Sequence, residues 1–182
     1  IKNLNKMVTK NFKKVGNHIL IIGKTLGHLY QSEFFREVLD FNEGPPPETN
    51  LFNEKNNGLA VLNLISKKLV KSVHDVSSGG ILVALSEMSI SSNIGAIIDL
   101  PKNNIKLHEY LFGEDQSRYI IEVQEKNIKE VNTILKDSSI YFEKIGMTQK
   151  AYMEVKKEFK TSINDLETLY KYWFKNYFKE NI

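Results

Sequence analysis

Residues 73–80 read VHDVSSGG and stand between a short apolar strand and a largely apolar helix. The two glycines let the backbone turn tightly, and a helix mouth after such a turn presents N–H groups and a favourable dipole to an anion. The pattern therefore predicts a strand, a turn and a helix, with a phosphate or carboxylate as candidate ligand. A structural alternative stays open, in which Asp75 and Ser77 only satisfy turn amides and the glycines permit close packing.

Strand and helix patterns alternate on both sides of this turn. We expect strands at residues 18–23, 73–76, 95–100, 119–123 and 141–145, and helices at residues 31–41, 54–69, 81–91 and 128–135. The prolines at residues 45–47 end the first helix, because proline lacks the backbone N–H and forces its predecessor into an extended conformation. The alternation alone allows either a parallel α/β sheet or an α+β arrangement.

The C-terminal part of the chain has a different character. Thr161 or Ser162 can cap a helix whose apolar stripe comprises Ile163, Leu166, Leu169, Tyr170, Trp173, Phe174, Tyr177 and Phe178. We therefore expect a domain of residues 1–156 and a C-terminal aromatic helix of residues 157–182 packed on it. Packing in the domain core is the expectation, and contact with a partner domain is the alternative.

Two polar loops are further candidates for ligand binding. Residues 111–118 read LFGEDQSR and cluster acid, amide, hydroxyl and guanidinium groups before a strand. They form either a ligand-binding edge or an ordinary turn closed by an Arg–carboxylate pair. Residues 27–32, GHLYQS, resemble a ligand loop that opens a helix, although Ser32 can equally be only the helix N-cap.

Composition limits the possible functions. The 182 residues fit one ordinary domain, and the absence of cysteine excludes disulfides, thiolate catalysis and cysteine-bound zinc. We expect a cytoplasmic protein. A net charge of +3 from 25 basic and 22 acidic residues is too small and too dispersed for a nucleic-acid surface, and no apolar run approaches a membrane span. Because the chain opens IKN without Met, we expect it to be a piece of a longer protein.

Signatures of independent catalysis are missing. The four histidines, at positions 18, 28, 74 and 108, show no metal-ligand spacing. Neither a phosphate-binding Gly-x4-Gly-Lys-Ser/Thr loop nor a G-x-S-x-G elbow occurs. A self-contained ATPase or hydrolase is thus disfavoured, and we assign no catalytic residue and no metal ligand to this chain.

Three strings in a fixed order resemble the final domain of the phosphoribosylformylglycinamidine synthase family, in its small bacterial type. They are GHLYQS, followed by RE and GPPP, within residues 27–47, VHDVSSGG at residues 73–80 and LFGEDQSR at residues 111–118. The middle string alone marks the wider superfamily of aminoimidazole ribonucleotide synthetase, selenophosphate synthetase and thiamine-monophosphate kinase. The resemblance covers about residues 8–150. Three positions depart from the family: Tyr30 replaces glycine, Ser78 aspartate and Asp115 serine, and Tyr30 is expected to close a pocket.

The resemblance implies a fold and an activity. The fold is α+β, a mixed sheet flanked by helices like the C-terminal domain of aminoimidazole ribonucleotide synthetase, with an added C-terminal helix. The whole enzyme of that family makes formylglycinamidine ribonucleotide from formylglycinamide ribonucleotide, ATP and glutamine-derived ammonia in purine biosynthesis. It uses ATP and Mg²⁺, but the family's catalytic histidine and main metal ligands lie upstream. This chain alone should be inactive and need no cofactor.

The implied partners are the missing N-terminal domains, a glutaminase subunit and a small accessory subunit, without nucleic acid or membrane. Our candidate ligand or phosphate-binding residues are His74, Asp75, Ser77, Gly79, Gly80, Glu114 and Gln116. The family's substrate-contacting motif lies in the first half of the enzyme and has residues 114–116 as its counterpart here, so this site serves a vestigial or structural nucleotide or no ligand. Two alternative functions stay open: a related synthetase or kinase domain, and a stand-alone binding domain.

Overall fold

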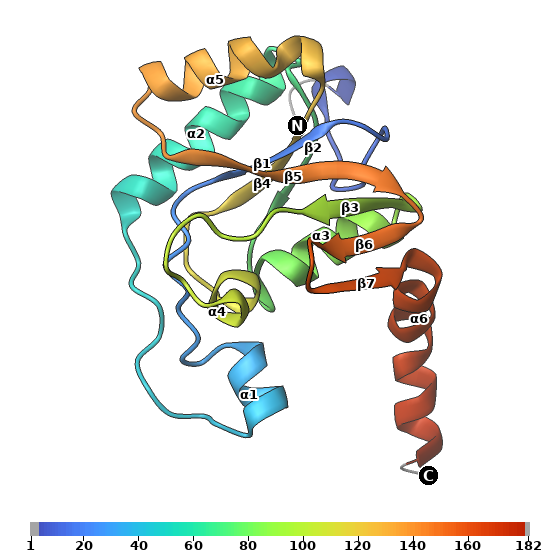
Figure 1. Ribbon diagram of the computed structural model, residues 1–182. Helices are drawn as coiled ribbons and strands as arrows, with labels where there is room; N and C mark the ends of the chain where they lie inside the picture. Colours follow the sequence, from blue (N-terminus) through green and yellow to red (C-terminus); the bar gives the residue numbers. More distant parts are fainter. Residues whose placement is uncertain (1–3, 181–182) are drawn as a thin grey trace.

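A mixed β-sheet of seven strands runs through the computed structural model, which describes residues 4–180 (Figure 1). The strands are β1 (His18–Ile22), β2 (Val70–Asp75), β3 (Ile94–Ile98), β4 (Tyr119–Val123), β5 (Phe142–Lys150), β6 (Tyr152–Val155) and β7 (Phe159–Ser162). Their order is β2-β4-β1-β5-β3-β6-β7, and neighbours are antiparallel except the parallel pair β3 and β6. The expected α+β class with a mixed sheet is confirmed, and a parallel α/β sheet is excluded.

Helices cover both faces of this sheet. They are α1 (Glu33–Leu39), α2 (Leu51–Ser66), α3 (Gly80–Ile90), α4 (Leu107–Phe112), α5 (Ile128–Asp137) and α6 (Ile163–Glu180), with short 3₁₀ turns η1 (Leu4–Lys6) and η2 (Glu125–Asn127). In Figure 1, α2 and α5 lie above the sheet, whereas α3 and α4 lie below it. The sheet is therefore buried on two sides.

The strand β1 lies inside the sheet and is apolar at every position after His18, because both of its faces are covered. Ile19 and Ile21 pack in the core on the α3 side, whereas Leu20 and Ile22 pack in the core on the α2 side. Successive side chains of a strand point to opposite faces, so a strand covered on both faces needs an uninterrupted apolar run. All four side chains are at most 1% exposed.

A fully buried carboxylate holds the N-terminal segment against the sheet. Glu122 of β4 is 0% exposed. Its oxygens accept hydrogen bonds from the backbone N–H of Lys13 at 2.9 and 3.1 Å and of Lys14 at 3.1 Å. The side chains of Asn17 and Ser72 donate two more, at 2.6 and 2.8 Å. A buried charge is tolerated when its hydrogen bonds are made, and here the bonds join the segment before β1 to β2 and β4.

Several predicted boundaries shift by a few residues. The helix expected at residues 54–69 is α2 at 51–66, because the Asn50 side chain caps it early and Lys68 adopts a left-handed turn with φ of 59°. The chain then enters β2 earlier than expected. The hairpin of β6 and β7 was not predicted from the sequence. Its pairing runs from Tyr152 with Ser162 to Val155 with Phe159.

The C-terminal helix α6 packs on the domain only through its first turns. Ser162 caps its N-terminus as predicted, and Ile163 is 2% exposed. Leu166 packs partly buried against the core on the α3 side. Trp173 and Phe174, however, are 59% and 58% exposed. The expectation that these two rings pack in the domain core is wrong, because α6 extends past the edge of the sheet (Figure 1).

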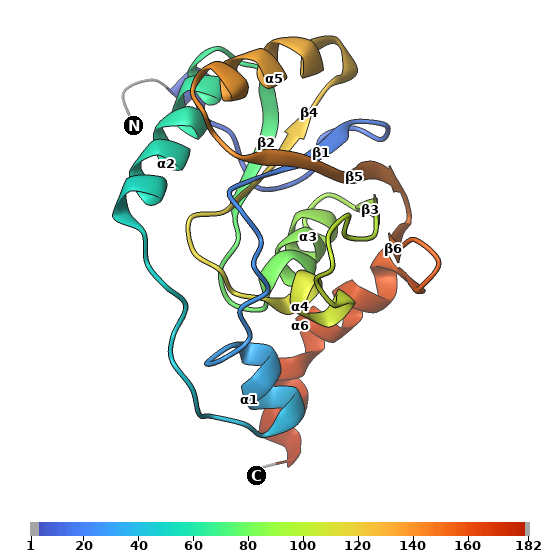
Figure 2. The same cartoon turned by 60° about the vertical axis from the view of Figure 1, so that its left-hand side comes forward.

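The helices α1 and α6 project from the same end of the domain. Both lie below the sheet in Figure 1 and remain there in the rotated view of Figure 2. The helix α1 is joined to the domain through polar contacts near residues 26–36, described below, and through the ring of Phe34, which stacks on Phe112 of α4 with centroids 4.7 Å apart. The helix α6 is joined through the apolar contacts of its first turns.

Candidate functional site

The strand–turn–helix predicted from VHDVSSGG is present as β2, a turn and α3. Gly79 and Gly80 adopt φ of 78° and 70°, a left-handed conformation that glycine adopts without strain. A side chain at Gly80 would come within 2.7–2.8 Å of backbone atoms of residues 111–113. The glycines thus bring the mouth of α3 against the loop that begins at Gly113, which was the second candidate string.

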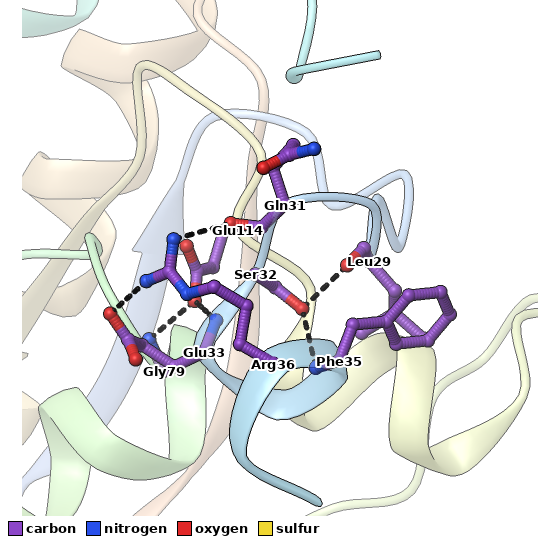
Figure 3. Close-up of polar contacts among 8 residues, drawn as sticks. All are labelled: Leu29, Gln31, Ser32, Glu33, Phe35, Arg36, Gly79 and Glu114. Atoms are coloured by element: carbon purple, nitrogen blue, oxygen red, sulfur yellow. Dashed lines mark hydrogen bonds and ion pairs between the residues drawn. The ribbon is translucent and has the colours of Figure 1, made fainter. Parts of the chain in front are cut away.

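Glu114 of that loop fills the mouth of α3. Its Oε1 atom accepts hydrogen bonds from the backbone N–H groups of Gly79 and Glu33, each at 2.8 Å (Figure 3). Glu33 is the first residue of α1, and Gly79 is the N-cap of α3. A carboxylate near helix N-termini is stabilised by the helix dipoles and by the N–H groups that lack partners within the helix. Glu114 therefore joins the beginnings of two helices, in the position where the sequence predicted an external anion.

The neighbouring Asp115 holds the loop before α1. Its carboxylate accepts hydrogen bonds from three successive backbone N–H groups, those of Leu26 and Gly27 at 2.9 Å and of His28 at 3.2 Å. Asp115 is 6% exposed. Consecutive N–H groups directed at one point form an anion-binding concavity, which here contains the chain's own carboxylate. The shape of residues 26–28 thus depends on Asp115.

Arg118 binds the same loop through its guanidinium group. Its guanidinium donates to the carbonyl oxygens of Asp115 at 2.9 Å and Gly113 at 2.5 Å, and to the hydroxyl of Thr25 at 3.2 Å. It lies 3.7 Å from the Asp115 carboxylate. Burial lowers the pKa of Arg118 to about 10, and the charge of Asp115 acts in the opposite direction. The alternative of a turn closed by an Arg–carboxylate pair is therefore what the structure shows for residues 113–118.

Ser32 acts as the N-cap of α1, as the alternative for the GHLYQS string expected. Its hydroxyl accepts from the N–H of Phe35 at 3.2 Å and donates to the carbonyl of Leu29 at 2.6 Å (Figure 3). Arg36 reaches back to the Glu33 carboxylate and to the Gln31 carbonyl. These contacts fix the beginning of α1, and none of them requires a ligand.

His74 lies between two carboxylates on the other side of the α3 mouth. Its Nε2 is 2.8 Å from Glu87 of α3 and its Nδ1 is 3.2 Å from Asp75. Lys10 also donates to Glu87 at 2.8 Å. Burial by itself raises the pKa of Glu87, but the hydrogen bonds from Lys10 and His74 outweigh it and hold that pKa below its ordinary value. The cluster ties the N-terminal segment, β2 and α3 together.

A cavity of about 850 Å³ opens beside the loop that Asp115 holds. Residues 26–30 line the cavity, and so do Asn53, Asn56 and Asn57 of α2. Amide side chains both donate and accept hydrogen bonds, so this lining suits a polar ligand. Asn57 also donates to the Ser117 carbonyl at 2.8 Å, which ties α2 to the loop after Asp115.

Tyr30 forms part of the cavity wall, at the position where the resemblance implies glycine. Its ring packs edge-on against Phe35, with centroids 5.7 Å apart, and lies 6.2 Å from the ring of Phe41. The ring is covered by Gly44, where a side chain would come within 2.3 Å of it. The expected closure is only partial, since Tyr30 borders a cavity that remains open.

The structure separates the seven predicted residues into three places. Glu114 and Gly79 are joined by a hydrogen bond, and the Gly80 N–H donates to the Ser77 carbonyl at 3.1 Å. His74 and Asp75 meet in the Glu87 cluster. Gln116 is the predicted residue that lines the cavity.

Three residues that shape this site stand outside the seven predicted ligand residues. Asp115 and Arg118 belong to the candidate loop 111–118, where the Arg–carboxylate turn was the stated alternative to a ligand-binding edge. Glu87 was not predicted at all. The two acids followed by an arginine in LFGEDQSR were the available signal for Asp115 and Arg118, whereas no local signal distinguished Glu87 from a solvated helix residue.

Within residues 4–180, no three histidine or carboxylate side chains gather closely enough to hold a metal ion. Magnesium is usually bound through carboxylates and substrate phosphates. We assign no step of a reaction to a metal in this chain. The same stretch contains no helix of sufficient length and apolarity to span a membrane.

Comparison with known proteins gives a consistent result. Residues 14–156 match the family "AIR synthase related protein, C-terminal domain". The chain is 46% identical over 177 residues to phosphoribosylformylglycinamidine synthase subunit PurL of Pelagibacter ubique (strain HTCC1062). That match covers 97% of this chain and 24% of the relative, so the chain spans about a quarter of that protein.

Solved structures show the same fold at low sequence identity. Thermotoga maritima PurL complexed with ATP matches with a TM-score of 0.73 and 18% identity, over 90% of this chain and 28% of that chain. PurL in the structure of PurLQS from the same organism matches with a TM-score of 0.70 and 20% identity, over 91% and 28%. These likenesses show the fold of the domain.

Proposed function

Because the chain belongs to the family of AIR synthase related protein C-terminal domains, we propose that it is the C-terminal part of a phosphoribosylformylglycinamidine synthase. The observation that carries the proposal is the 46% identity to the Pelagibacter ubique subunit over 97% of this chain. It favours the synthase over a related kinase or a stand-alone binding domain. We also propose that residues 1–156 are the family domain and that residues 157–182 are an addition, whose strand β7 extends the sheet of that domain before α6 begins.

The whole enzyme, in this proposal, replaces the amide oxygen of formylglycinamide ribonucleotide by nitrogen. ATP phosphorylates that oxygen, ammonia attacks the carbon, and the oxygen leaves with the phosphoryl group as inorganic phosphate. The products are formylglycinamidine ribonucleotide, ADP and phosphate. Positioning and charge stabilisation around the phosphates supply most of the catalysis in such a transfer, with Mg²⁺ as the usual contributor.

This chain contributes a binding surface to that enzyme. Gln116 faces a ligand in the cavity, whereas Glu114, Gly79, Gly80 and Ser77 shape the junction between the α3 mouth and the loop. His74 and Asp75 hold β2 against α3. A phosphate that approached residues 77–80 would have to displace Glu114 from Gly79, which is why we assign these residues to positioning.

The cofactors and partners of the proposal belong to the whole enzyme. The Thermotoga maritima relative has been solved in complex with ATP, and another structure contains PurLQS. By analogy we propose that ATP and Mg²⁺ serve the upstream domains, that a glutaminase subunit and a small accessory subunit assemble with the enzyme, and that it works in the cytoplasm.

The test uses the whole polypeptide that carries this chain, with ammonia as nitrogen donor. We expect ADP and formylglycinamidine ribonucleotide to form in equal amounts, and only when ATP, Mg²⁺, formylglycinamide ribonucleotide and ammonia are all present. A polypeptide that hydrolyses ATP without amidating this substrate would contradict the proposal. The matched control is the 182-residue chain alone, from which we expect no turnover above background. Turnover by this chain would contradict the assignment of catalysis to the upstream domains.

A further inference from the structure

Beyond its packed first turns, α6 exposes one continuous apolar surface. This aromatic face consists of Leu169, Tyr170, Trp173, Phe174 and Phe178, which recur at helical spacing. The five residues are 45% to 71% exposed. The rings of Trp173 and Phe174 lie 5.6 Å apart and those of Phe174 and Phe178 4.6 Å apart, so the surface is contiguous. Contiguous exposed apolar surface of this kind marks a contact with another body.

The helix needs that contact for its own stability. Among the α6 side chains that the structure describes, Ile163 and Leu166 are the ones that pack against the core on the α3 side. Most helical stability in proteins comes from packing of the apolar face. The outer turns of α6 have their apolar face uncovered in this domain. A covering body would provide the missing packing.

The comparison with the relatives indicates which domain or protein covers this face of α6. The family domain ends at residue 156, before α6 begins at Ile163. The match to the Pelagibacter ubique subunit nevertheless extends over 177 of the 182 residues. Five residues at most lie outside it, fewer than the 18 of α6, so most of the helix is shared with the synthase subunit. That subunit is about four times as long as this chain, since the chain covers 24% of it.

We propose that the aromatic face of α6 docks on another domain of the same synthase polypeptide. The inference rests on the proposed function, because it requires the additional domains that the relatives possess. None of the five side chains carries a charge, and permanent interfaces are more apolar than transient ones. A contact within one polypeptide also benefits from a high effective concentration.

The position of α1 supports a body at this end of the molecule. Both views show α1 and α6 projecting from the same end of the domain (Figures 1 and 2). There α1 exposes Val38 and Leu39 to 64% and 55%. A domain that covers the aromatic face at this end of the molecule would therefore also lie near the exposed Val38 and Leu39 of α1.

Photo-crosslinking in the whole polypeptide tests the contact. Benzoylphenylalanine replaces Trp173 in one variant and Tyr172 in a matched control, because Tyr172 is aromatic and 52% exposed but lies off the aromatic face. We expect the probe at position 173 to link to a peptide outside these 182 residues within a single polypeptide. Its yield should be several times that of the probe at position 172. Both substitutions keep an aromatic ring, so the fold should persist.

Three results would overturn the proposal. They are a link between two copies of the polypeptide, a link that forms only to a different subunit, and equal yields at positions 172 and 173. The ATP-dependent synthesis assay on the same preparation separates the two proposals. An intramolecular link in a protein that makes no product would reject the function and keep the contact, whereas an active enzyme without the link would reject the contact alone.

Discussion

The carboxylate of Glu114 accepts a hydrogen bond from the backbone N–H of Gly79, 2.8 Å away, at the mouth of α3. The same oxygen accepts from the N–H of Glu33 at the beginning of α1. The N–H groups that the sequence marks as an anion site are therefore bound by the chain's own anion. An external phosphate or sulfate can therefore bind these two N–H groups only if it displaces the Glu114 carboxylate.

Removing the Glu114 carboxylate should open an anion site at Gly79. In crystals of Glu114→Ala soaked with sulfate, we expect an ordered anion within hydrogen-bond distance of the N–H groups of Gly79 and Glu33, because both lose their acceptor. Glu114→Gln is the matched control, since its amide oxygen still accepts a hydrogen bond and should keep sulfate out. An ordered sulfate at Gly79 in the unaltered protein would show that Glu114 does not block the site.

Acid should destabilise the protein partly through Glu87. The pKa of Glu87 in the folded protein is lower than its ordinary value of 4.5. The unfolded chain therefore binds the proton first, so the stability contributed by the bonds to Lys10 and His74 is complete above pH 4.5 and is lost as the pH falls through the folded pKa. Urea midpoints measured from pH 6 to pH 3 should fall less steeply for Glu87→Gln.

The control for this titration is Glu158→Gln, which changes an exposed carboxylate outside the cluster. It should follow the unaltered protein. If Glu87→Gln also follows the unaltered protein below pH 4.5, the cluster does not contribute the stability that its geometry predicts.

Glu122 should be the most sensitive carboxylate of the domain. Replacing it by alanine leaves four donors without their acceptor: the N–H groups of Lys13 and Lys14, and the buried side chains of Asn17 and Ser72. Each buried donor left without its acceptor costs roughly 1–3 kcal/mol of unfolding free energy. Chemical denaturation of Glu122→Ala should show a loss of this size, whereas Glu130→Ala on the exposed side of α5 should change little. Equal losses in the two variants would refute the role of Glu122.

Trp173 should be accessible to solvent in the isolated chain. It is the single tryptophan, so its fluorescence reports on this position. With the ring 59% exposed, we expect red-shifted emission that iodide quenches readily. Trp173→Ala should alter stability by less than about 0.5 kcal/mol, whereas Ile163→Ala, at a 2% exposed position, should cost about 2–5 kcal/mol. Blue-shifted, quencher-resistant emission from a monomer would show instead that Trp173 packs in the domain core.

The parts of this protein that were predictable depend on local sequence. The strand, turn and helix around VHDVSSGG follow from glycine conformation and from an apolar run, and the cap at Ser162 follows from the helical stripe after it. Both features need only neighbouring residues. The resemblance to a family then selected the mixed sheet that alternation alone left undecided.

The parts that were not predictable depend on distant partners. Glu122 stands within an apolar strand, and its partners come from residues 13–17 and from Ser72, so no local pattern marks it as a structural anion. The role of Asp115 depends on the N–H groups of residues 26–28, which are 87–89 positions away. The stripe of α6 predicts an apolar helix face, but periodicity cannot specify which domain or protein covers that face.

The place of β1 in the sheet affects how the protein folds during its synthesis on the ribosome. β1 lies at residues 18–22, yet the strands on either side of it are β4 at residues 119–123 and β5 at residues 142–150. The nascent chain thus carries an unpaired apolar strand until most of the domain has been translated. Unpaired apolar strands of this kind favour aggregation, and late long-range pairing slows folding. The strand β1, which is buried on both faces in the folded domain, is therefore unpaired for the longest part of synthesis. We expect a chaperone to bind the nascent chain at this strand first.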